Sequence, residues 1–193
     1  HGNLFGAVSF IKQAEKRGIK PILGCEGYLV TDHKNDERPG RENHKSYHLG
    51  LLAKNFQGYQ NLCKVVSDAH VDGFYYRPRT DLETLAEHAD GLIGFTGCMQ
   101  GWVPQLILRE QEEEAEKALG QMVEIFGKEN YFVELHNHGI KEQAQLVPEL
   151  IKLAKKFGLK TVASNDVHYV KGEDWAPHDA LLCIQTGSKL DDV

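Results

Sequence analysis

The sequence of 193 residues has little of what marks secreted and membrane proteins. Its four cysteines, Cys25, Cys63, Cys98 and Cys183, are scattered and form no CxxC pair. No apolar run approaches the ~18 residues that a membrane helix needs, and nothing resembles a signal peptide. We therefore expect no disulfides and no membrane partner, and a reducing, cytoplasmic compartment.

Positive charge is also scarce. The chain has 22 Lys and Arg against 28 Asp and Glu, which gives a formal net charge of −6. This balance disfavours a protein that grips nucleic acid through bulk positive charge, although a local basic groove is compatible with it. The 41% of apolar residues is typical of a globular domain that buries a core.

Several catalytic motifs are missing as well. The sequence contains no GxSxG elbow, no GxxxxGK[ST] loop, no GxGxxG after a strand and no HExxH helix. These absences disfavour a serine hydrolase and nucleotide binding by the usual loops. The chain begins at His1 instead of Met and ends at Val193 without a helix stop signal, so we expect a piece of a longer protein.

What the sequence does have is a repeated pattern of helix and strand. Amphipathic stretches end in glycine and are followed by short apolar runs, which indicates αβ units. The helix-strand pairs cover residues 4–18 and 19–26, 82–91 and 92–98, 115–127 and 131–135, and 147–158 and 161–166. A further strand at 48–53 precedes a helix at 56–66, and residues 31–46 are expected to form a solvated loop. The pattern predicts a mainly parallel sheet covered on both faces, either open or closed into a barrel.

Metal-ligand residue types occur where several of these strands end. Glu26 follows Cys25, Cys98 follows a second strand, and Asp166 and His168 follow a third. Carboxyl ends of parallel strands meet at one edge of a sheet, so these side chains are expected to converge. Two further histidines, His136 and His138, follow the strand at 131–135 and alternate along the chain.

Each of these residues also has a plainer interpretation. Asp166 could cap the next helix, Glu26 could lie on the surface, and Cys98 could be a core residue. His48 opens its strand instead of ending it, so a structural role is the default there. His136 and His138 could face the site, stand behind its ligands or be exposed. Surface or capping roles are expected for the remaining internal histidines: His33, His44, His70, His88 and His178.

Taken together, the residues predict a multinuclear metal site. Glu26 and Asp166 are the natural bridging carboxylates for paired metals. Such sites polarise a phosphoryl oxygen and lower the pKa of a bound water. The residues alone therefore indicate a metal-dependent hydrolase that acts on phosphate esters.

Six ordered blocks of sequence resemble one known family. The chain is similar over nearly its whole length to the polymerase-and-histidinol-phosphatase (PHP) domain of bacterial DNA polymerase III alpha subunits. The blocks are HGNLFGAV (1–8), GIKPILGCE (18–26), HLGLLAKN (48–55), GFYYRPR (73–79), NDVHY (165–169) and HDALLCIQTG (178–187).

The resemblance implies an α/β fold, a distorted seven-stranded (β/α) TIM-like barrel that is incomplete at its N-terminus. It implies a PHP domain over residues 1–178 and an exit segment towards a polymerase palm domain over 179–193. The implied metal ligands are His1, Glu26, His48, Cys98, Asp166 and His168, which would hold two or three divalent ions (Zn, Mn or Fe). Of these, Glu26, Asp166 and His168 are expected to be catalytic, and His136 and His138 to stand behind the ligands.

The resemblance also implies a parent protein. That protein would be a replicative DNA-directed DNA polymerase that uses Mg and binds DNA, a proofreading exonuclease subunit and other replicase subunits. The domain itself would be a phosphoesterase or 3′–5′ exonuclease. Two alternatives stay open: a stand-alone phosphoesterase of the histidinol-phosphatase type, and a non-catalytic scaffold that docks a proofreading subunit.

Overall fold

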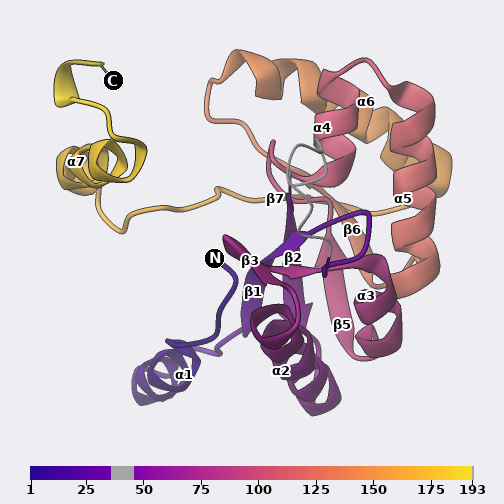
Figure 1. The fold of residues 1–193 in the computed structure, drawn as a ribbon, viewed down its shortest axis with the longest axis horizontal. Helices are drawn as coiled ribbons and strands as arrows, with labels where there is room; N and C mark the ends of the chain where they lie inside the picture. The colour runs from indigo at the N-terminus through magenta and orange to yellow at the C-terminus, as the bar shows by residue number, and fades with distance from the viewer. Residues whose placement is uncertain (36–45, 193) are drawn as a thin grey trace.

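The computed structural model describes residues 1–35 and 46–192 (Figure 1). Seven strands form one sheet: β1 (Gly24–Leu29), β2 (Tyr47–Ala53), β3 (Phe74–Tyr75), β4 (Arg77–Thr80), β5 (Leu92–Phe95), β6 (Tyr131–Leu135) and β7 (Thr161–Ala163). The helices are α1 (Ala7–Lys16), α2 (Phe56–Val71), α3 (Leu82–His88), α4 (Trp102–Leu108), α5 (Glu112–Phe126), α6 (Lys141–Phe157) and α7 (Trp175–Thr186). Two short 3₁₀ turns, η2 (Gly172–Asp174) and η3 (Leu190–Asp192), flank α7.

The sheet is mixed, which corrects the expectation of a mainly parallel one. Its strand order is β3-β4-β1-β2-β5-β6-β7. The pairs β1–β4, β5–β6 and β6–β7 are parallel, whereas β2 runs antiparallel to both of its neighbours, β1 and β5. Because β2 is reversed, its first residues lie at the same edge as the last residues of β1, β5, β6 and β7.

The expected α/β class is confirmed, but the sheet does not close. Strands β3 and β7 are its two ends, and no pairing joins them within residues 1–35 and 46–192. The barrel expected from the resemblance is therefore not confirmed, because the sheet of the described residues is open. No helix in the described part of the chain is long and apolar enough to cross a membrane.

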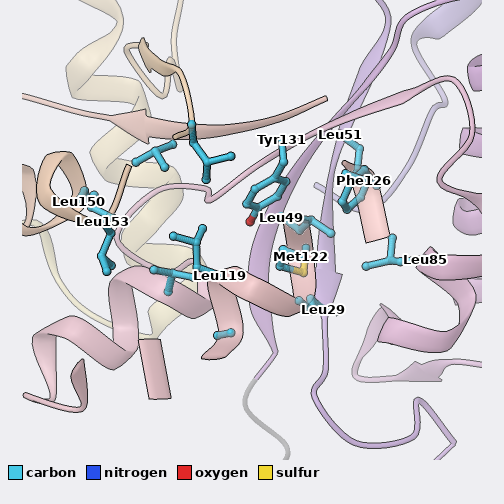
Figure 2. Packing of buried hydrophobic residues seen from close by; sticks show 14 of the residues in the cluster. Leu29, Leu49, Leu51, Leu85, Leu119, Met122, Phe126, Tyr131, Leu150 and Leu153 are labelled. Carbon is cyan, nitrogen blue, oxygen red and sulfur yellow. The ribbon is translucent and has the colours of Figure 1, made fainter. Parts of the chain in front are cut away.

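One apolar core joins the sheet to α2–α6. Leu49 and Leu51 of β2 point to the same side and meet side chains from α5, including Leu119 and Met122 (Figure 2). Tyr131 of β6 stacks against Phe126, with 5.6 Å between ring centroids. Burial of such side chains is the dominant stabilising term, at ~1.5–3 kcal/mol for each large one.

The two terminal helices are packed much less completely. Helix α7 contacts mainly η2 and η3 and stands apart from the other helices in Figure 1. Its Ile184 is 81% exposed, and Phe5, just before α1, is 87% exposed. The segment boundary expected at 178/179 falls inside α7, which continues through it without interruption.

Two local expectations need correction, and a third is confirmed over the part of its range that the structure describes. The first strand starts at Gly24, so Glu26 lies near its beginning and not at its end. Strand β7 stops at Ala163, so Asp166 and His168 belong to the following loop and do not share a strand face. Residues 31–35 and 46 lie outside helices and strands, as the loop prediction requires, whereas its central part, 36–45, lies outside the described residues together with His44. Helices α4 and α7 and the short strands β3 and β4 were not predicted.

Candidate metal centre

Glu26 lies at the centre of a cluster of potential metal ligands. Its Oε2 is 2.8 Å from His1 Nε2, and its Oε1 is 2.9 Å from His48 Nδ1. One ligand atom from each of these three residues lies within 4.8 Å of the other two. This is the nitrogen and oxygen donor set that Zn²⁺, Mn²⁺ and Fe²⁺ accept.

The pairing of β1 with β2 explains how His48 reaches Glu26. Tyr28 pairs with His48 and Glu26 with Gly50, so Glu26 and His48 are diagonal neighbours across two antiparallel strands. The His48 amide donates to the Gln100 carbonyl, at 2.9 Å, which fixes this end of β2. His48 thus lies at the functional edge although it opens its strand, because that strand is the reversed one.

Cys98 approaches the same cluster from the loop after β5. Its Sγ is 3.5 Å from His48 Nδ1 and 3.9 Å from Glu26 Oε1. Burial, reinforced by the carboxylates of Glu26 and Asp166, raises the pKa of the Cys98 thiol to about 12. The thiol therefore stays protonated in this environment unless a cation replaces the proton, which links metal binding to proton release.

His1 is held beside Glu26 by the backbone of its neighbour Gly2. The Gly2 amide donates to the Glu26 carbonyl at 2.7 Å, and the Gly2 carbonyl is 2.9 Å from His70 Nε2. Gly2 has φ +70, and a Cβ there would come within 2.7 Å of Pro78 Cγ. His70, which we expected at the surface, therefore anchors the segment that carries His1.

Asp166 and His168 reach the site from the loop after β7. The two residues line a cavity of about 600 Å³ together with His1, His48 and Cys98. The ring centroids of His1 and His168 are 6.2 Å apart. Asp166 has a backbone φ of +45, in the left-handed region that few residues with a side chain adopt and that aspartate tolerates better than most.

The ring of His168 is oriented as metal-binding histidines usually are. Its Nδ1 is 2.6 Å from the carbonyl oxygen of Asp166. A carbonyl oxygen only accepts hydrogen bonds, so Nδ1 carries the proton and Nε2 keeps its lone pair. Metal-ligating histidines commonly donate their other N–H to a backbone carbonyl in this way.

A second polar group lies behind the ligands. His136 is 8% exposed, and its Nε2 is 2.7 Å from Ser164 Oγ and 3.3 Å from Glu134 Oε1. The hydrogen bond to Glu134 raises the pKa of His136. These three residues line a cavity of about 440 Å³ that also borders Glu26 and Asp166.

Four residues of this region were missed or undervalued in the sequence. Glu134 alternates with His136, a period-2 signal that could have paired them, and Ser164 stands two residues before Asp166. Gln143 is buried beside His138 and carried no signal of its own. His178, expected at the surface, lines the 600 Å³ cavity with its ring centroid 5.9 Å from that of His168.

Fold and cluster together define an α/β domain with a candidate metal centre at one edge of its sheet. The chain belongs to the PHP domain family, whose family model matches residues 1–138. It is 47% identical over 193 residues to DNA polymerase III subunit alpha of Thermus aquaticus, and 43% identical over 192 residues to that of Treponema pallidum (strain Nichols). Each match covers 100% of this chain but only 16% of the relative, so the chain spans about a sixth of the length of these proteins.

Proposed function

We propose that this chain is the PHP part of a bacterial DNA polymerase III alpha subunit and that its metal centre hydrolyses phosphate esters. The parentage is supported by similarity that runs from the first residue to the last. The hydrolytic function rests on one observation, the His1–Glu26–His48 cluster with Cys98 beside it at the wall of an open cavity.

The proposed ligands are His1, Glu26, His48, Cys98, Asp166 and His168. They would hold two or three divalent ions, for which Zn, Mn and Fe fit the mixture of imidazole, carboxylate and thiol donors. When bound, such ions polarise a phosphoryl oxygen and increase the acidity of water. The carboxylate of Glu26 already bridges two imidazoles, which suits a ligand shared between ions.

The side chains around the cavity would orient the ester and move protons. In hydrolysis, a water oxygen bonds to phosphorus, one P–O ester bond breaks, and the departing oxygen takes up a proton. Asp166 lines this cavity and would accept the proton that the attacking water loses. His168 lies in the same loop as Asp166. Its Nδ1, and not its Nε2, contacts the Asp166 carbonyl oxygen.

The proposal extends to the complete PHP domain and to the parent polymerase. The open sheet would be part of a distorted seven-stranded barrel in the complete domain. The parent would carry out DNA-directed DNA synthesis with Mg²⁺ in the cytoplasm, bind DNA, and assemble with a proofreading exonuclease subunit and other replicase subunits.

The test is hydrolysis by the full-length protein after reconstitution with Mn²⁺ or Zn²⁺. We expect release of nucleotides from a 3′ end, and we expect Asp166→Asn to abolish it. The matched control is Asp90→Asn, since Asp90 is an exposed carboxylate in the turn before β5. Cleavage that survives Asp166→Asn would show that the site is wrong, and metal retention without any cleavage would support the scaffold alternative instead.

A further inference from the structure

His138 lies beside the proposed centre, yet its placement differs from that of the six proposed ligands. It follows β6 and lines the 600 Å³ cavity together with His1, His48 and Asp166. Within residues 1–35 and 46–192 it forms no hydrogen bond or ion pair with a proposed ligand and instead bonds to Gln143, in the first turn of α6. We propose that His138 is a neutral hydrogen-bond donor that binds a phosphoryl oxygen of the substrate, an inference that rests on the proposed function.

Gln143 fixes which ring nitrogen of His138 carries the proton. The backbone N–H of His138 donates to one end of the Gln143 amide at 2.7 Å, and because a backbone N–H only donates, that end is the oxygen. The other end is therefore the NH₂ group, and it lies 3.0 Å from His138 Nδ1. An NH₂ group donates, so Nδ1 accepts, and the proton of the neutral imidazole belongs on Nε2.

Burial keeps the Gln143 side chain in the position that orients the His138 ring. Gln143 is only 4% exposed, so its two hydrogen bonds are shielded from competing water. Its oxygen accepts from the His138 amide, which lies before the N-cap Ile140, so this bond ties the preceding loop to the first turn of α6. The second bond, from the NH₂ group to the ring, orients the imidazole.

A neutral donor suits the charge of this cavity. No lysine or arginine is among the described residues that line it, so no fixed cation is available to hold an anionic ester. A lysine there would repel the divalent ions that the ligands would hold. A neutral Nε2–H donates to an anionic oxygen without this repulsion, and among the described residues Nε2 has no protein partner.

The experiment compares three variants of the full-length protein loaded with Mn²⁺, with inorganic phosphate as the probe. His138→Leu removes the donor, His138→Gln restores an amide N–H donor near the Nε2 position, and His33→Leu is the control at an exposed histidine outside the cavity. We expect His138→Leu to weaken phosphate binding by calorimetry by about 10- to 100-fold. His138→Gln should recover most of the loss, His33→Leu should match the wild type, and the metal content should not change in any of them.

Two results would overturn the inference. Unchanged phosphate affinity in His138→Leu would show that the ring does not contact the anion, and loss of metal from this variant would make His138 a ligand. An ¹⁵N spectrum of histidine-labelled protein gives a second measurement that needs no activity: we expect a protonated Nε2 and an unprotonated Nδ1, and the opposite tautomer would refute the argument. A wild type that binds phosphate through His138 but hydrolyses no ester would refute the proposed function and leave this inference standing.

Discussion

The candidate centre consists of two halves that are built differently. Glu26 and His48 come from paired strands, and Cys98 from the short turn that follows β5, so their backbones are fixed by the sheet. Asp166 and His168 come from a loop beyond the last strand, outside the sheet. Glu26, His48 and Cys98, the strand-held half, already contact one another. Asp166 and His168, the loop-held half, line the cavity and form no hydrogen bond or ion pair with Glu26 in the described part of the chain.

The difference indicates how the centre would work. A half that is assembled before any ion arrives loses little conformational entropy on binding, so it should provide most of the affinity. The loop that carries Asp166 and His168 lies beyond the end of β7, where no strand pairing of the described residues holds it, so it can adjust to the ion and the ester. We therefore expect the strand-held residues to control metal affinity and the loop-held residues to control turnover.

The largest effect is expected for Glu26→Gln. The amide keeps the shape of the side chain but loses the charge that holds His1 and His48 and would bridge two ions. We expect metal affinity to fall by about 100-fold or more. The control is Glu129→Gln, at a side chain that is 81% exposed and paired with Lys160 at the surface. Isothermal titration with Mn²⁺ measures the metal affinity of both variants. Equal affinities would refute the claim that the strand-held residues control metal binding.

Gly58→Ala tests whether close packing of α2 against the start of β5 stabilises the sheet that carries the candidate centre. Gly58 of α2 lies against the turn that starts β5, and a Cβ there would come within 1.8 Å of the Gly91 carbonyl oxygen. We expect the opening free energy of β2 and β5, measured by hydrogen exchange, to fall by about 3 kcal/mol.

Gly120→Ala is the matched control in another helix. A Cβ at Gly120 meets nothing closer than 3.7 Å. The alanine should stabilise α5 by about 0.5–1 kcal/mol through its higher helix propensity. The same loss in both variants would show that close packing at Gly58 is not what holds β5.

Cys98→Ser tests whether the strand-held half determines which metal the centre prefers. A hydroxyl replaces the soft sulfur ligand, so we expect the affinity for Zn²⁺ to fall by about tenfold while that for Mn²⁺ changes little. Competition titrations with both metals measure the ratio. An equal loss for the two ions would mean that Cys98 supports the centre through packing and not through its thiol.

The smallest effect concerns the buried polar group behind the ligands. Since the hydrogen bond to Glu134 raises the pKa of His136 above its usual 6.5, the stability from this pair is fully present below pH 6.5. It is lost as the pH rises through the raised value in the folded protein. Without metal, His136→Gln should therefore be less stable than the wild type by about 1 kcal/mol at pH 6, and the gap should close towards pH 9; a constant gap in hydrogen exchange would contradict the charge-based account.

The sequence predicted those helices and strands whose apolar periodicity is strong, and it missed α4, α7, β3 and β4. The stretches around Leu119 and Leu150 form α5 and α6, as expected, and Tyr131–Leu135 forms a strand. The direction of β2 could not be predicted, because strand polarity depends on pairing and not on periodicity. That reversal is why His48 was undervalued from its position alone.

Only part of the candidate site could be predicted, because residue type indicates a ligand but not the neighbours that the fold gives it. Residue types expected at strand ends indicated Glu26, Cys98, Asp166 and His168, and the resemblance to PHP domains added His1 and His48. The structure brings His1, Glu26 and His48 together, with Cys98 adjacent. Gln143 and Ser164 could not be inferred, because an uncharged residue gains its role only from the histidine that the fold places next to it.

The most direct test of the central claim is a metal count on the full-length protein. The wild type and Glu26→Gln would be purified without chelator, dialysed against metal-free buffer and analysed for Zn, Mn and Fe per chain by mass spectrometry. We predict two or three retained ions in the wild type and a clear loss in the variant. No retained metal in the wild type, or the same content in both proteins, would contradict a metal centre organised by Glu26.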